Sequence, residues 1–192
     1  MARTADPARR VELIDEIIGK LAETGIAQFS LRTLAAALGR STRVLTHHFT
    51  DKNALLRAVL ERLDELQHQA LAATPGWTDP AVGVGAIVRD AWQRHLRDGE
   101  IARTRLVHEI EGLAAAGRLT DHVPLFVSGR ARFVADALVL RGLSPEDALV
   151  KATLLNNAYA GVQTDHLITG DVGRTSAALE LLCALADGWT RV

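Results

Sequence analysis

The sequence of 192 residues carries a formal net charge of −1, with 48% hydrophobic and 23% charged residues. This balance is that of an ordinary globular protein and excludes an intrinsically disordered chain. The length allows a small domain joined to a larger one. Aromatic residues make up only 4% while Ala and Leu are abundant, which favours helices over sheets.

The single cysteine, Cys183, excludes an intrachain disulfide framework and suits a reducing compartment. Its apolar setting, LELLCALA, predicts a buried side chain rather than a reactive thiol. The first 16 residues are polar and charged, without a signal-peptide pattern, and no apolar run approaches membrane-spanning length. We therefore expect a soluble cytoplasmic protein with no membrane partner.

Helical periodicity starts with residues 7–23, which Gly25 is expected to end. The stretch from Ser30 to Leu56 then predicts two short helices joined by a tight turn at Gly39, with a third helix directly after them. Ser30 is a suitable N-cap, and Gly39 can adopt the left-handed conformation that ends a helix. Two short helices around such a turn are typical of the helix-turn-helix motif.

The remainder of the chain is predicted to be helical as well. A long helix over residues 51–72 leads to Thr74-Pro75-Gly76, the clearest break in the sequence. Further helices are expected at residues 79–98, 100–116, 121–141, 144–169 and 172–189, with Asp79-Pro80 and Ser144-Pro145 as starts. No strand-period segment or repeat is present, so the predicted fold class is all-α.

A series of residues in the first third of the chain has a distinctive spacing without gaps. They are Leu13, Ile14, Leu21, Gly25, Ser30, Leu31, Arg32, Leu34, Ala35, Leu38, Gly39, Ser41, Leu45, His48, Phe49, Lys52, Leu55 and Leu56. In this window the chain resembles the TetR family of bacterial transcriptional regulators. The resemblance covers about a quarter of the chain. With the break at residue 74, it implies a helix-turn-helix DNA-binding domain at residues 1–50, a connecting helix at 51–74, and a helical effector-binding and dimerisation domain at 75–192.

The charge of the helix-turn-helix fits this expectation. Between Gln28 and Leu60 there are five Arg or Lys residues and one acid, so this stretch carries +4 and the remainder of the chain −5. Such concentration of charge favours phosphate binding. A solvated basic face is the alternative interpretation where no motif is present.

Candidate DNA-binding residues follow from the motif. The second helix enters the major groove, where Thr42, Arg43, Thr46 and His47 can reach base edges, and Arg43 can bind either guanine or a phosphate. The resemblance also implicates Arg32, Ser41, Val44, His48 and Lys52. Three residues depart from the family pattern, namely Arg40 where Val is common, Arg43 where Gly is common and Thr46 where Tyr is usual.

The His47-His48 pair raises the alternative of a metal site. Adjacent residues on a helix point about 100° apart, so the two rings cannot easily share one ion. We therefore expect no metal and no cofactor.

One helix-turn-helix contacts few base pairs, so useful affinity normally needs two of them related by a dyad. The last two predicted helices carry small residues (Ala158, Ala160, Gly161) and an apolar stripe (Ala177, Ala178, Leu181, Leu182, Leu185). These faces are either internal core or a dimer interface. The resemblance implies a four-helix bundle across a homodimer.

The resemblance also implies a small-molecule pocket in the second domain. Candidate lining residues are Trp92, His95, Arg105, His108, Phe126, Phe133, Asn156 and Tyr159. Polar groups on apolar inward faces can orient a ligand, and an aromatic or amphipathic organic acid would suit these residues. The alternative is that the aromatic residues are core and that Arg105, His108 and Glu109 form an ion-pair cluster.

Catalysis is the main rival function. The segment His108-Glu109-Ile110-Glu111 lacks the second His of a zinc-protease motif, and no Gly-rich phosphate loop or nucleophile elbow is present. We therefore predict a protein that is not an enzyme. It is expected to be a repressor that binds a palindromic operator as a homodimer and is released by a small effector. An effector-independent DNA-binding regulator and a helical interaction module are the alternatives.

Overall fold

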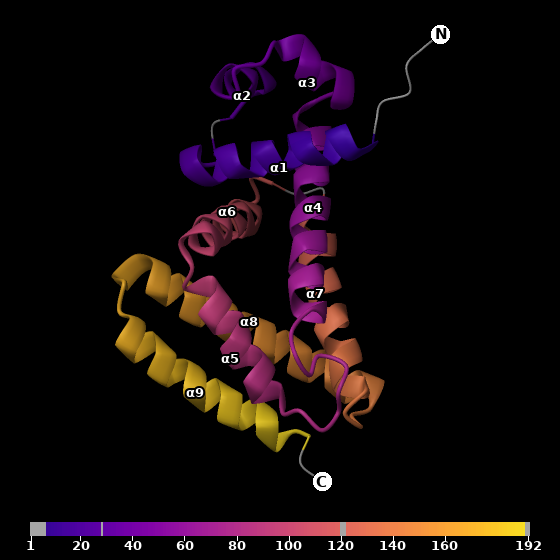
Figure 1. Ribbon diagram of the computed structural model, residues 1–192, viewed down its shortest axis with the longest axis vertical. Coiled ribbons are helices and arrows are strands. Elements are labelled where there is room, and N and C mark those ends of the chain that lie inside the picture. Colours follow the sequence, from indigo (N-terminus) through magenta and orange to yellow (C-terminus); the bar gives the residue numbers. More distant parts are fainter. Residues whose placement is uncertain (1–6, 28, 120–121, 191–192) are drawn as a thin grey trace. The chain divides into compact units, whose positions relative to one another are not determined.

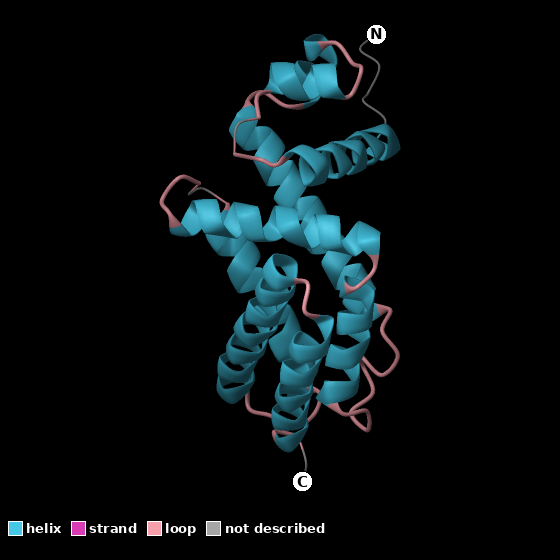
Figure 2. Cartoon of the chain, turned by 90° about the vertical axis from the view of Figure 1, so that its left-hand side faces the viewer, coloured by secondary structure: helices cyan, strands magenta, loops and turns pink. Residues whose placement is uncertain are grey.

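The structure is a computed structural model that describes residues 7–27, 29–119 and 122–190. Every regular element in these ranges is a helix (Figure 2), which confirms the predicted all-α fold class. The helices, coloured along the chain in Figure 1, are α1 Pro7–Thr24, α2 Leu31–Ala37, α3 Thr42–His48, α4 Lys52–Ala72, α5 Val84–His95, α6 Asp98–Ala115, α7 Val123–Val139, α8 Pro145–Thr169 and α9 Val172–Gly188. Among the described residues, none of the helices combines the length and the apolar character that crossing a lipid bilayer requires.

Internal contacts divide the chain into two compact units. Unit 1 comprises Met1–Glu65 and Arg105–Pro124, and unit 2 comprises Leu66–Thr104 and Leu125–Val192. Helices α4 and α6 therefore each contribute residues to both units. The predicted domain limits at residues 50 and 74 follow the order of the chain, whereas this division assigns the second half of α6 to unit 1.

Unit 1 is built around the apolar face of α1. The inward residues recur every three or four positions, as an amphipathic helix requires, and they are Leu13, Ile14, Ile17, Ile18 and Leu21. Each such side chain stabilises the fold by about 1.5–3 kcal/mol when fully buried. On the solvent side, Arg62 of α4 donates to both carboxylate oxygens of Asp15 at 2.8 and 2.9 Å, which ties α4 to α1.

Unit 2 is built on α5, α8 and α9, and α9 packs against both of the other two helices (Figure 1). Its core contains a cluster of buried residues that includes Val84, Val88, Trp92, Leu138, Ala152, Leu155, Leu179, Leu182 and Cys183. Cys183 is fully buried, as its apolar setting predicts. Burial raises the pKa of its thiol to about 11, so the thiolate is absent near neutral pH.

The start of α5 is the main error in the predicted elements. The helix begins at Val84 rather than at residue 79, because Asp79 uses its carboxylate to accept the N–H of Ala81 in a turn. Arg141 then holds the whole segment, since its guanidinium donates to the carbonyl oxygens of Gly76, Trp77, Asp79, Val82 and Ala137. A charged side chain that is 7% exposed closes this loop. The predicted start of the next-but-one helix, residue 121, lies outside the described residues.

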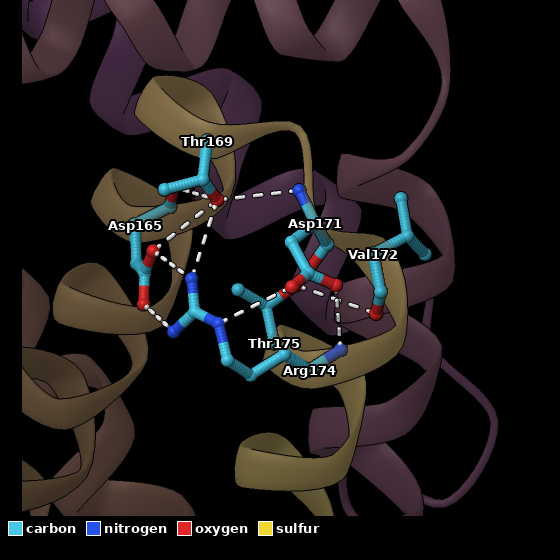
Figure 3. A network of polar contacts seen from close by, with 6 residues as sticks. All are labelled: Asp165, Thr169, Asp171, Val172, Arg174 and Thr175. Atoms are coloured by element: carbon cyan, nitrogen blue, oxygen red, sulfur yellow. Dashed lines mark hydrogen bonds and ion pairs between the residues drawn. The ribbon is translucent and has the colours of Figure 1, made fainter.

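A polar network fixes the turn between α8 and α9 (Figure 3). Gly170 ends α8 in the left-handed conformation (φ 68°), and Asp171 caps α9 by accepting the N–H of Arg174 at 2.9 Å. The Arg174 guanidinium bridges back to Asp165 of α8 at 2.5 and 2.7 Å. Hydrogen bonds from Arg174 lower the pKa of the Asp165 carboxyl. The geometry of the last two helices is therefore set at their junction.

Candidate nucleic-acid interface and effector site

The helix-turn-helix forms as its capping residues predict. Ser30 and Thr33 make a reciprocal capping box at the start of α2, with the Thr33 N–H 3.1 Å from Ser30 Oγ and the Ser30 N–H 2.9 Å from Thr33 Oγ1. Gly39 has φ 64°, so the turn uses the freedom of a residue without a side chain. Asp51 caps α4 by accepting the N–H of Ala54 at 2.8 Å. The Ser41 side chain, by contrast, makes no cap hydrogen bond at α3.

Helix α3 has a buried side and a solvent side. Leu45 and the following Phe49 are 0% and 1% exposed. They anchor the helix, while the predicted reading residues Thr42, Arg43, Thr46 and His47 are all exposed. The two sides are related by the helical period. Four polar side chains are therefore presented together on a short, firmly packed helix.

The remaining candidates on and around α3 differ in how free they are. Val44 and His48 are half-buried, and the His48 ring packs edge-on against His47 with centroids 5.1 Å apart. The Thr46 hydroxyl turns back to donate to the carbonyl of Thr42 at 3.2 Å. Arg32 is exposed on α2. Within the described ranges, no group of three or more His, Cys, Asp or Glu residues is arranged to hold a metal ion.

Two basic residues of this stretch already have partners inside unit 1. Arg40 makes a two-pronged ion pair with Glu16 of α1, at 2.7 and 2.8 Å from its Nη2 to the two carboxylate oxygens. Lys52 lies with its Nζ 4.4 Å from the centroid of the Phe29 ring, a cation–π contact. Arg40 therefore stabilises the contact between α1 and the turn, although it counts toward the positive charge of the stretch.

The eight candidate effector residues are distributed over both units. Arg105 and His108 belong to unit 1, where Arg105 is exposed and His108 Nδ1 lies 3.8 Å from Glu111. The other six belong to unit 2, namely Trp92, His95, Phe126, Phe133, Asn156 and Tyr159. His108 thus lies next to Glu111, whereas the Glu109 carboxylate accepts backbone N–H groups of Ile26 and Ala27.

Within unit 2 several of these residues meet on α5 and α8. Trp92 is 1% exposed and donates its indole N–H to Ser176, while its ring packs edge-on against Tyr159. Burial raises the pKa of the Tyr159 hydroxyl, so the group stays neutral and available as a donor. Asn156, one turn before Tyr159, has a buried Nδ2 with no hydrogen-bond partner in the described part of the chain.

The other aromatic candidates pack elsewhere in unit 2. Phe133 stacks with His68 and with Trp77, at centroid distances of 3.9 and 5.0 Å. Phe126 is buried, and the Arg130 guanidinium lies 4.8 Å from its ring centroid. His95 is buried and hydrogen-bonded to His166.

Glu109 binds the loop between α1 and α2, a role that the sequence does not reveal. Its carboxylate accepts the backbone N–H groups of Ile26 and Ala27, each at 3.0 Å, in the loop that leads from α1 to α2. Gly25 directly before them has φ 81°. The partners are more than 80 residues apart in sequence, and Glu109 resembles an ordinary surface acid of a helix. The sequence therefore gives no local signal for this contact.

Comparison with known proteins bears directly on this helix-turn-helix. Residues 13–59, which include α2 and α3 and most of α1, match the sequence model of the bacterial regulatory proteins of the tetR family. The chain belongs to the TetR family. The resemblance in the N-terminal quarter is thereby confirmed.

Curated relatives of this TetR-family chain include HTH-type transcriptional regulators named BetI. BetI 2 of Chromohalobacter salexigens is 29% identical over 104 residues, which cover 53% of this chain and 50% of that protein. BetI of Yersinia pestis is 34% identical over 85 residues, with 42% of each chain covered. The chain thus spans about half the length, or less, of these relatives.

Solved structures extend the likeness along nearly the whole chain. The multidrug binding protein EbrR in complex with imidazole is 27% identical, with 97% of this chain and 94% of that chain covered and a TM-score of 0.71. A TetR-family member from Streptomyces coelicolor A3 is 25% identical, with 93% and 97% covered and a TM-score of 0.73. The helices after residue 59 therefore follow the fold of TetR-family proteins too.

Proposed function

We propose that this TetR-family protein is a transcriptional repressor that binds a palindromic DNA operator as a homodimer in the cytoplasm and is released by a small organic effector. The observation that carries the proposal is the exposed polar face of α3 on a packed helix-turn-helix. Such a helix can enter the major groove, where Arg43 can donate two hydrogen bonds to a guanine. No catalytic role is part of the proposal.

The experiment that tests DNA binding begins with recovery and sequencing of the genomic fragments that the protein retains, followed by titration of the recovered duplex. Arg43→Ala is expected to weaken binding by about 1–3 kcal/mol, as for loss of a bidentate base contact. Arg40→Ala is the matched control, because Arg40 is already paired with Glu16. If Arg43→Ala and wild type bind the duplex with equal affinity, α3 is not the reading helix.

Dimerisation is supported by apolar residues that the core of unit 2 does not use. On α9, Leu181 is 76% exposed and Leu185 is 49% exposed, and Ala177 and Ala178 are exposed on the same helix. Leu182 points the other way, into the core. Large exposed apolar residues gathered on one helix mark an interaction site.

Light scattering at micromolar concentration is expected to give twice the mass of the chain. Leu181→Glu is expected to give monomers with an unchanged helical signal in circular dichroism, whereas Glu180→Gln, next to it on the solvent side, keeps the dimer. A wild-type monomer would contradict the dyad, which places the two reading helices about 34–36 Å apart.

Effector release is supported by unit 2 and by one structural relative. Trp92 and Tyr159 contribute aromatic surface. Asn156 contributes a buried Nδ2 donor that has no hydrogen-bond partner among the described residues. EbrR, named a multidrug binding protein, is described in complex with imidazole, malachite green, proflavin and ethidium. We propose an aromatic organic compound as the effector.

A thermal-shift screen with these four compounds and with aromatic carboxylic acids tests this part. A true ligand at 100 times its Kd stabilises the folded state by about 2.7 kcal/mol, and it should also lower the affinity for the operator. If no compound shifts the melting temperature, the proposal of an aromatic organic effector fails.

A further inference from the structure

A groove lies beside the reading helix within unit 1. Its volume is about 360 Å³, several times the roughly 30 Å³ that one water molecule occupies in the liquid. Its walls are the first turns of α1, the end of α3 and the first half of α4. The lining residues are Arg10, His48, Phe49, Thr50, Ala54, Arg57, Ala58 and Glu61. The groove is therefore large enough for a hydrated phosphate group.

The charge of the lining is predominantly positive. Arg10, Arg57 and His48 face a single acid, Glu61. The Arg10 guanidinium lies 5.7 Å from the centroid of the Phe49 ring, which holds it at the groove wall. Unlike Arg40 and Arg62, which are bound to Glu16 and to Asp15, neither Arg10 nor Arg57 forms an ion pair with any residue of the described ranges. Two guanidinium groups are thus left to solvent in one groove.

His48 shows the effect of this surplus. Burial lowers the pKa of the imidazole, and the positive charges of His47 and Arg10 lower it further. An anion in the groove would counteract the repulsion from His47 and Arg10, because it would supply the negative charge that the lining lacks. The two arginines and His48 that line the groove could all donate to such an anion.

We propose that this groove binds one phosphodiester of the DNA backbone next to the major groove that α3 enters, with Arg57 and Arg10 as its two charged donors and His48 as a third donor. The inference rests on the proposed DNA binding and adds a contact that the spacing of the motif does not indicate. The end of α3 forms one wall of the groove, so the strand that borders the reading helix runs past the groove mouth. The two guanidiniums carry the charge, and Phe49 fixes the position of one of them.

The test is a titration of wild type, Arg57→Gln and Arg10→Gln with a duplex recovered from genomic DNA and with an unrelated duplex of equal length, at several salt concentrations. Each phosphate contact adds about 0.9 to the slope of log K against log salt concentration. Because both guanidiniums act on one phosphate, each single variant should lose part of that amount and the double variant about all of it, and affinity should fall equally on both duplexes. Arg40→Gln, the matched control, should keep the wild-type slope.

A second arm identifies the phosphate directly. Single methylphosphonate replacements, which remove one backbone charge at a time, are introduced along each strand of the recovered duplex. At one position the replacement should weaken wild type more than Arg57→Gln, because the two changes remove overlapping contacts to the same phosphate. Arg57→Lys, which keeps the charge, should restore most of the slope.

The outcomes are distinguishable. If wild type binds both duplexes with a steep salt dependence but both glutamine variants keep its slope, the groove is not a phosphate site and the proposed function stands. If wild type shows no salt-dependent binding of any duplex, the proposed function fails and the groove proposal with it. Unchanged melting temperatures of the variants establish that the change in slope is not a folding defect.

Discussion

His95 Nε2 lies 3.1 Å from His166 Nδ1, in a hydrogen bond that joins α5 to α8 inside unit 2. The neighbouring Thr104 hydroxyl donates to the carbonyl of Glu100 at 2.8 Å, so it can only accept from His95 Nδ1, 3.4 Å away. This geometry fits a His95 tautomer that carries its proton on Nδ1 and accepts at Nε2 from His166 Nδ1–H. Both side chains are less than 9% exposed, so the pair is a buried polar link between two helices.

This link predicts how the pair responds to mutation. His166→Phe removes one side of the hydrogen bond at the buried His95 Nε2 and should lower the free energy of unfolding by about 1–3 kcal/mol. The double variant with His95→Phe should lose less than the sum of the single changes, because no polar group is then left unpaired. Urea denaturation measures these differences, and nitrogen NMR shifts of the imidazoles report the Nδ1–H tautomers. Additive losses would contradict the pairing.

Glu109 is expected to stabilise the loop before the helix-turn-helix. Glu109→Ala removes the acceptor of the Ile26 and Ala27 N–H groups, and hydrogen bonds to a charged group contribute about 1.5–3 kcal/mol. Denaturant unfolding should show a loss of this size, and Glu109→Gln, which keeps one acceptor oxygen, should lose less. Glu12→Ala, at an exposed position of α1, serves as the control. A loss no greater than that of the control would argue against the loop contact.

Gly85 allows α5 and α9 to approach each other closely. A side chain at Gly85 would place its Cβ 2.7 Å from Asp187 Oδ2 and 2.9 Å from the Cys183 carbonyl oxygen. Gly85→Ala should therefore destabilise unit 2 by about 1–3 kcal/mol through overpacking. Gly129→Ala on α7, where nothing lies within 4 Å, should instead stabilise by up to about 1 kcal/mol through helix propensity. In thermal melting, Gly85→Ala should lower the melting temperature and Gly129→Ala should raise it.

His48 predicts a pH dependence of stability and of DNA affinity. Its folded pKa is below the ordinary 6.5, so its contribution to stability is fully present above pH 6.5 and is lost as the pH falls through the folded pKa. A phosphate bound in the groove would raise the pKa of His48, so DNA binding would take up a proton. The affinity for DNA should therefore rise as the pH falls through this window. The charges of His47 and Arg10 lower the pKa of His48, and Arg57 and Glu61 are the other charged residues that line its groove.

Titrations between pH 5.5 and 7.5, at constant ionic strength, measure the effect. His48→Gln should flatten the dependence of affinity on pH relative to wild type, while His122→Gln, on a residue outside the groove lining, should not. An affinity that falls with decreasing pH in wild type alone would contradict the proton uptake.

Local signals were enough to predict the helix-turn-helix. Ser30, Gly39 and Asp51 act through hydrogen bonds or backbone conformations within three residues, so their roles can be inferred from the sequence. Long-range partners could not be predicted in this way. Arg40 pairs with Glu16, which lies 24 residues away, and Glu109 accepts the backbone N–H of Ile26. Both contacts depend on how the helices pack, which no local pattern of the sequence indicates.

The same limit explains the misplaced start of α5. Asp79-Pro80 has the form of a good helix start, but it lies in a loop whose carbonyl groups are already engaged by Arg141. Among the candidate effector residues, Trp92 of α5 and Tyr159 of α8 contact each other, whereas Arg105 belongs to unit 1. The sequence could not predict this separation, because it depends on how distant helices pack.

The loop held by Arg141 has a consequence for where this chain tolerates change. By composition, Thr74-Pro75-Gly76 is the natural place to insert a tag, open the chain for circular permutation or expect cleavage by a protease. Because the buried Arg141 guanidinium donates to the carbonyls of Gly76, Trp77 and Asp79, an insertion there would take acceptors away from a buried charged group. Lysine, with a compact ammonium in place of a planar fork, could not span the same set. The apparent weak point of the sequence is thus one of the better secured segments of the protein.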